Sequence, residues 1–236
     1  MSELEQVEKE NLSARVYGRL RRALIDGQFE PGERLRISAL ASDLGTSITP
    51  VREAIFRLVS EQALEMKAAT AIHVPVLDST RLKEIQLIRM HLEGAATERA
   101  AERITDKQLK RLEAIQADFI EAAATSPKKA SLRNRDFHFA LIEIADLPLV
   151  ESIVEKLWTL MGPVLSVFHT TMPVRQIAGK DHRHYEVLSA LRARDPAAAR
   201  RAIQMDIQWG LEMADWLDRQ ASDPPARRKL ASLKTD

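Results

Sequence analysis

Residues 35–60 constrain the fold of this chain more than any other stretch, because two short helical patterns flank a turn signal there. The first pattern spaces apolar residues three and four apart and stops at Gly45, the residue type that most readily adopts a positive φ. The second pattern runs over residues 51–59 and keeps to one helical face. Ser47 or Thr49 is positioned to cap the start of this second helix. The stretch therefore predicts two short helices that meet at a tight turn.

The spacing of three residues sets how these two helices pack. Ala41 is small enough for a close crossing, Gly45 makes the turn, and Val51 wedges the second helix against the first. Thr49 and Arg52 are then directed outward at the start of the second helix, where a helix-turn-helix presents side chains to the major groove of DNA. The pattern favours DNA binding over an ordinary helical hairpin in a core.

A β-hairpin is predicted directly after this motif. Residues 63–67 and 72–76 carry strand-forming residues on either side of a short polar turn. They would form a wing beside the helices, in which Lys67 and His73 could approach phosphate groups. The alternative for both side chains is simple solvation, which is the common state of an exposed charge on a hairpin.

Three blocks of sequence stand in order around this motif: Asp26-Gly-Gln-Phe-Glu-Pro-Gly-Glu-Arg-Leu35, Leu40-Ala41 and Thr49-Pro-Val-Arg-Glu-Ala54. Their order and spacing resemble the N-terminal domain of GntR-type bacterial transcription regulators over residues 11–77. The resemblance implies a winged helix-turn-helix that binds a double-stranded DNA operator as a homodimer. Two positions depart from the family pattern, since Ile48 replaces the usual arginine and Thr70-Ala71 replaces the usual Arg-Gly. The candidate DNA contacts are Ser38, Ser47, Thr49, Arg52, Lys67 and His73.

Composition narrows the classes of protein that the chain can belong to. Its 236 residues suffice for two modest domains. Thirty-five basic against 34 acidic side chains leave a net charge of +1, so DNA binding must depend on local geometry rather than on a basic field. The absence of cysteine excludes disulfides and thiol nucleophiles. No apolar run has membrane-spanning length and the N-terminus is acidic, so we expect no membrane partner and a cytoplasmic location.

Every long segment after residue 78 has a helical pattern with a capping residue or proline near its start. The predicted helices cover residues 79–103, 105–124, 127–146, a stretch from 148 interrupted at Gly162-Pro163, 174–194 and 196–217. The fold class is therefore mainly α, a winged helix-turn-helix followed by an antiparallel bundle of about six helices. The expected organisation is a disordered segment 1–10, the DNA-binding domain 11–77, a linker 78–80, the bundle 81–220 and a flexible tail 221–236.

Four polar residues of the predicted bundle could form a metal site. Asn134 and His138 lie four apart on one face of the third helix, with His184 on the fifth and Asp206 on the sixth. Two imidazoles joined by oxygen donors from facing helices suit a divalent cation. Spacing alone leaves open that His138 is a polar core residue bonded to a neighbour. His182 precedes His184 by two residues, which turns it away from this face.

Several runs of the bundle support a more specific expectation: Arg89-Met-His-Leu-Glu93, Asn134-Arg-Asp-Phe-His-Phe-Ala-Leu141, His184 to Asp195 and Ala199 to Asp206. They resemble the all-helical effector domain of the FadR branch, called FCD. In metal-binding members of that family the four ligand positions fall on Asn134, His138, His184 and Asp206. Here Asn134 stands where many members have aspartate, and Asp206 stands where many have histidine. The resemblance implies a divalent ion such as zinc or nickel.

Family members commonly sense small organic acids, and Arg89 could bind such a carboxylate through two parallel hydrogen bonds. The alternative is a salt bridge between Arg89 and Glu93, four residues on. The sequence thus predicts a ligand-responsive transcription regulator without enzymatic activity, and a repressor by family habit. Two other classes stay open: a metal-dependent hydrolase, and an interaction protein whose DNA-binding head has decayed.

Overall fold

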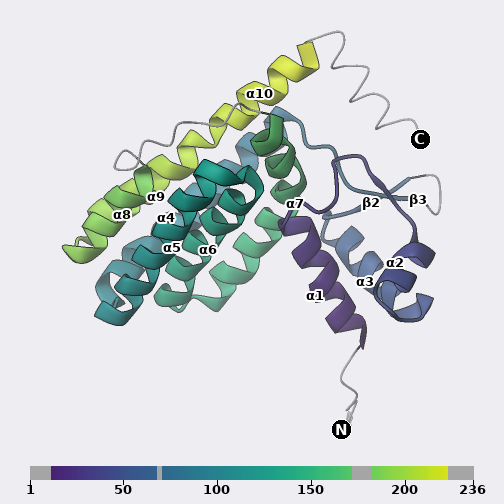
Figure 1. Cartoon of the computed structure of the whole chain (residues 1–236), viewed down its shortest axis with the longest axis horizontal. Helices are drawn as coiled ribbons and strands as arrows, with labels where there is room; N and C mark the ends of the chain where they lie inside the picture. The colour runs from purple at the N-terminus through teal and green to yellow at the C-terminus, as the bar shows by residue number, and fades with distance from the viewer. Residues whose placement is uncertain (1–11, 68–70, 172–181, 223–236) are drawn as a thin grey trace, which may run out of the picture.

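The computed structural model describes residues 12–67, 71–171 and 182–222, which form an N-terminal unit beside a helical bundle (Figure 1). The N-terminal unit contains α1 (Leu12–Ile25), β1 (Arg34–Leu35), α2 (Ile37–Asp43), α3 (Ile48–Ser60), β2 (Glu65–Lys67) and β3 (Ala71–His73). The bundle contains α4 (Ser79–Arg103), α5 (Asp106–Thr125), α6 (Pro127–Ala145), α7 (Pro148–Thr171), α8 (Arg183–Arg192), α9 (Pro196–Trp209) and α10 (Leu211–Ser222). The predicted fold class is confirmed. The expected disordered N-terminus, most of the expected tail and Thr70 of the wing lie outside the described residues.

The helix-turn-helix forms as its periodicity predicts. Gly45 adopts a φ of +61° between α2 and α3, and Val51, Ile55 and Leu58 of α3 are fully buried. They pack against the apolar face of α1. Ser47 occupies the N-cap position of α3, but its side chain makes no capping hydrogen bond there. Ser47 is therefore at the predicted N-cap position, but the predicted hydrogen bond from the cap side chain is not formed.

The wing is one strand larger than predicted. β2 and β3 pair antiparallel, with Glu65 opposite His73, and the short β1 pairs with the other edge of β3. Two residues of strand carry too little alternation to be seen in a sequence. The third strand ties the wing to the segment that leads into α2.

Capping residues begin the first two bundle helices where they were expected. Asp78 accepts a hydrogen bond of 2.7 Å from the backbone of Arg81, and Thr105 forms a capping box with Gln108. Within the described ranges no helix is both long enough and apolar enough to span a membrane.

Two predicted helix boundaries are wrong. α7 continues through Pro163 without interruption, because burial on neighbouring helices holds a turn that an isolated helix would lose. The predicted last helix is instead divided at Gly210, where the backbone N–H donates to Ile207 and so tightens the final turn of α9. The described residues of the bundle accordingly form seven helices rather than six.

The N-terminal unit docks on the bundle through α1 and α7, which lie side by side (Figure 1). A side chain at Gly162 would place its Cβ 2.3 Å from the carbonyl oxygen of Leu24, so the glycine permits backbone contact. Two ion pairs flank this contact, Arg21 with Glu155 and Asp26 with Arg135. The position of the DNA-binding unit is therefore set by α6 and α7.

We expect Gly162→Ala to lower the free energy of unfolding by about 1–3 kcal/mol, because the added methyl group overpacks the contact with α1. Gly18→Ala is the matched control, since its Cβ would meet no atom within 4 Å. This control should raise stability by about 0.5–1 kcal/mol through helix propensity. Urea denaturation of the two variants measures both effects, and equal stabilisation by both substitutions would contradict the close contact.

Candidate functional site

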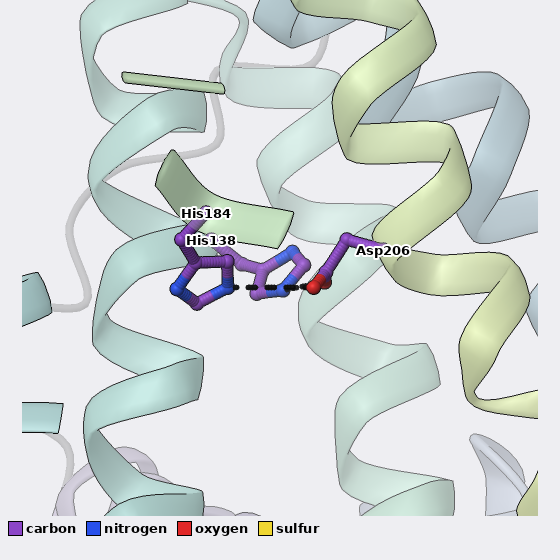
Figure 2. Close-up of side chains that lie close together, drawn as sticks. All are labelled: His138, His184 and Asp206. Carbon is purple, nitrogen blue, oxygen red and sulfur yellow. Dashed lines mark ion pairs between the residues drawn. The ribbon is translucent and has the colours of Figure 1, made fainter. Parts of the chain in front are cut away.

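Three of the four predicted metal ligands converge inside the bundle. His138 of α6, His184 of α8 and Asp206 of α9 each offer one donor atom, and these atoms lie within 4.8 Å of one another. Nε2 of His138 is 3.1 Å from Oδ2 of Asp206, and Nε2 of His184 is 3.8 Å from Oδ1. Figure 2 shows the two imidazole rings beside the carboxylate. Each oxygen of Asp206 thus faces a different histidine.

Asn134 lies one helical turn before His138 on α6 and is half-buried. This places it on the same side of the helix as His138. Its part in the cluster stays a prediction.

Both histidines are oriented by a second partner on the other ring nitrogen. Nδ1 of His138 is 2.7 Å from a carboxylate oxygen of Glu93, and Nδ1 of His184 is 2.7 Å from the amide oxygen of Gln116. The ring of His184 also stacks on Phe137, with 3.9 Å between the ring centroids. An amide oxygen accepts a hydrogen bond, so Nδ1 of His184 carries the proton and Nε2 carries the lone pair.

Nε2 of His184 is a buried atom without a hydrogen-bond partner among the described residues. A buried polar atom in that state is costly unless something else satisfies it. Its lone pair lies close to the carboxylate of Asp206 and to Nε2 of His138. The donor set therefore fits a cation with nitrogen and oxygen ligands.

Without a bound ion, the surroundings of the two histidines shift their pKa values in opposite directions. Burial alone would lower the pKa of His138, but Glu93 and Asp206 outweigh it and raise this pKa. Burial lowers the pKa of His184 well below its usual value. Burial also opposes ionisation of Glu93, yet Arg89 and His138 lower the pKa of this carboxyl to about 2. Burial opposes ionisation of Asp206 as well, but His184 and His138 outweigh it and lower the pKa of this carboxyl.

Arg89 is held inside the bundle rather than presented to an effector. It is 4% exposed, its Nε donates to Glu93 over 2.6 Å, and its guanidinium lies over the ring of Trp158. Nη1 also donates to the amide oxygen of Gln86 over 3.0 Å. The structure therefore supports the salt bridge, which was the alternative to effector binding, and Arg89 neutralises Glu93 behind the cluster.

His182 lies close to the cluster, contrary to the sequence argument. Its ring centroid is 4.3 Å from that of His184 and 4.6 Å from that of Phe119. The periodicity argument fails because His182 is the N-cap of α8 and does not have a helical backbone. Sequence reasoning also missed Gln116, which carries no local signal for this role.

The predicted DNA contacts outside the wing lie on or next to α2 and α3. Ser38, Ser47, Thr49 and Arg52 are all exposed. Each is accessible to DNA, and Arg52 lies within the helix that the motif directs toward the major groove.

The two predicted wing residues are placed differently. Lys67 is half-exposed and forms a 2.7 Å ion pair with Glu65. His73 is buried, only 6% exposed, and its Nδ1 is 3.1 Å from the carbonyl oxygen of Gly32. The prediction that His73 approaches phosphate is therefore wrong, because the ring is turned into the N-terminal unit, where the Gly32 carbonyl oxygen binds it.

Comparison with known proteins gives matches over most of the chain. Residues 12–74 match the gntR family of bacterial regulatory proteins, and residues 84–208 match the FCD domain. The chain is 32% identical over 198 residues to the transcriptional regulator McbR of Escherichia coli, covering 82% of this chain and 88% of that protein. A solved structure of E. coli McbR/YncC superposes with a TM-score of 0.82 at 31% identity, covering 90% of this chain and 99% of that chain.

Two further relatives are also regulators. The Nta operon transcriptional regulator of Aminobacter aminovorans is 30% identical over 179 residues, covering 72% of this chain and 80% of that protein. The transcriptional repressor RspR of E. coli is 26% identical over 217 residues, covering 90% of this chain and 92% of that protein. These relatives are regulators rather than enzymes, which contradicts the hydrolase alternative.

The buried ion pair yields a stability prediction. Arg89→Met should lower the free energy of unfolding by about 3–5 kcal/mol, because Glu93 loses the cation that compensates its buried charge. The control is Arg103→Met, which removes an exposed partner of Asp146 and should cost less than about 1 kcal/mol. Thermal and urea unfolding measure both. A loss for Arg89→Met no larger than for the control would show that Glu93 does not need Arg89.

Proposed function

We propose that a small carboxylate, bound at the histidine cluster, controls the binding of this protein to DNA. The proposal starts from the family: the chain belongs to the GntR family of bacterial transcription regulators and carries an FCD domain. A homodimer would present two DNA-binding units to a two-fold symmetric operator in the cytoplasm. Repression is the proposed outcome, in line with the name of the relative RspR.

One observation carries the proposal that the cluster binds a divalent metal. Nε2 of His184 has no hydrogen-bond partner in the described part of the chain, and it lies beside Asp206 and His138 deep in the bundle. His138, His184 and Asp206 would hold the ion, and Asn134 is the proposed fourth ligand. A bound ion would supply a Lewis-acidic position that attracts a carboxylate effector. Glu93 and Gln116 orient the two imidazoles from behind, as the outer partners of metal-binding histidines generally do.

The route from this site to DNA is short. α6 carries His138 and, three residues earlier, Arg135, which forms an ion pair with Asp26 at the end of α1. Residues three apart lie on neighbouring positions of one helix surface. A small rotation of α6 on effector binding would therefore move the partner of Asp26. We propose that this contact couples the site to the DNA-binding unit.

The metal proposal predicts a specific loss of affinity. His184→Ala should weaken Zn²⁺ or Ni²⁺ binding by at least about 100-fold, because it removes a direct ligand whose outer partners alone typically contribute 10–100-fold. His91→Ala is the control, since His91 is exposed on α4 and outside the cluster. Calorimetric titration of chelator-treated protein measures both affinities. Equal affinity in the two variants would remove the cluster as the metal site.

The same titration tests the fourth ligand. Asn134→Asp should tighten metal binding, because a carboxylate is a stronger donor than a neutral amide. The comparison is made with the unsubstituted chain, and an unchanged affinity would remove Asn134 from the ligand set.

The DNA-binding proposal makes a prediction for α3. Arg52→Ala should weaken specific operator binding by about 1–3 kcal/mol, the usual contribution of a bidentate arginine–guanine contact. Lys156→Ala removes the same charge from an exposed position on α7 and should leave binding nearly unchanged. Gel-shift titration of a selected genomic fragment distinguishes them, and equal operator affinity would exclude Arg52 from the reading surface.

A further inference from the structure

Ile48 is a large apolar residue at the start of the DNA-binding helix. It is the first residue of α3 and is 45% exposed. It belongs neither to the apolar core of the N-terminal unit nor to the partly buried residues packed against that core in the described chain. Folding of the unit therefore gives no reason for an isoleucine at this position.

Ile48 lies on the same side of α3 as Arg52, the residue proposed to contact a base. Ile48 and Arg52 are four residues apart, so they lie one above the other along one side of α3. Val51 and Ile55 are fully buried and face the core, while Arg52 is exposed. The N-terminal residues of a recognition helix are those that contact base edges in the major groove. Ile48 is thus placed to meet a base rather than the sugar–phosphate backbone.

We propose that Ile48 recognises a thymine through its C5-methyl group, close to the base pair that Arg52 reads. This inference rests on the proposed reading of DNA by α3. The methyl group of thymine is the apolar feature of the major groove, and aliphatic side chains contact it. Guanine or cytosine at that position would instead leave polar edge atoms against an aliphatic side chain, without hydrogen bonds. Ile48 therefore selects for thymine and against G·C pairs at once.

The helix geometry limits where this thymine lies. Four residues of α-helix rise about 6 Å, whereas base pairs are spaced about 3.4 Å apart along DNA. The thymine read by Ile48 is consequently within about two base pairs of the pair read by Arg52, in each half-site of a symmetric operator.

Selection from random duplexes tests the base preference. The full-length chain, Ile48→Arg and Arg52→Ala are each used to select duplexes from a randomised pool. The position whose preference disappears with Arg52→Ala locates the base pair read by Arg52. We expect the unsubstituted chain to enrich thymine within two positions of that pair, and Ile48→Arg to enrich guanine there instead. If the unsubstituted chain and Ile48→Arg enrich the same base at that position, the proposal is overturned.

Deoxyuridine isolates the methyl group itself, because it differs from thymidine only in lacking the C5-methyl. Replacing the selected thymine should weaken binding of the unsubstituted chain by roughly fourfold per half-site, the value of one buried methyl-sized group. The same replacement should have no effect on Ile48→Ala. Phe56→Ala is the control, because Phe56 is another exposed apolar residue of α3, two turns nearer its C-terminus; it should keep the fourfold effect.

The outcomes separate this inference from the function on which it rests. Selection of no sequence by the unsubstituted chain would refute both DNA reading by α3 and the role of Ile48. Selection of a defined sequence that tolerates deoxyuridine throughout, or an equal deoxyuridine effect in Ile48→Ala, would refute the role of Ile48 alone.

Discussion

Glu93 is a carboxylate at 1% exposure in the middle of the helical bundle, and much of the interior is arranged to make its charge tolerable. A buried charge without partners costs several kcal/mol. Arg89 on the same helix binds one side of Glu93, and Nδ1 of His138 on α6 binds the other. His138 in turn meets Asp206 on α9. A line of charged and polar groups thus fixes the rotation of α4, α6 and α9 about their axes more narrowly than apolar packing would.

The same helices determine where the DNA-binding unit sits. α6 bears Arg135 as well as His138, and α7 bears both Trp158, which covers Arg89, and Gly162, which touches the backbone of α1. The residues of the polar interior and those of the docking surface are therefore neighbours on the same two helices, one turn apart. Close-packed helices move as bodies rather than deforming gradually. Under the proposed coupling, a change at the histidine cluster would therefore reach α1 through α6 and α7 alone.

Much of the fold was predictable because its signals are local. The capping residues Asp78 and Thr105, the turn at Gly45 and the buried face of α3 all act within one or two helical turns. Failures occurred where distant contacts override a local preference. Pro163 normally ends a helix, but packing carries α7 through it. His73 has the position of an exposed wing residue in the sequence, but its ring is buried against the carbonyl oxygen of Gly32, 41 residues earlier.

The sequence by itself determined the two-part order of the chain, because helix periodicity, caps and motif spacing depend on near neighbours. Its resemblance to the FCD family, rather than spacing alone, pointed to the candidate ligands. The sequence left two readings open for Arg89, and it placed His182 away from the cluster. Only the tertiary structure decided these points. Which side chains share the interior depends on how α4, α5, α6, α8 and α9 are rotated against one another. That rotation is set by packing and charge pairing between residues far apart in the chain, such as Gln116 with His184, and no local pattern encodes it.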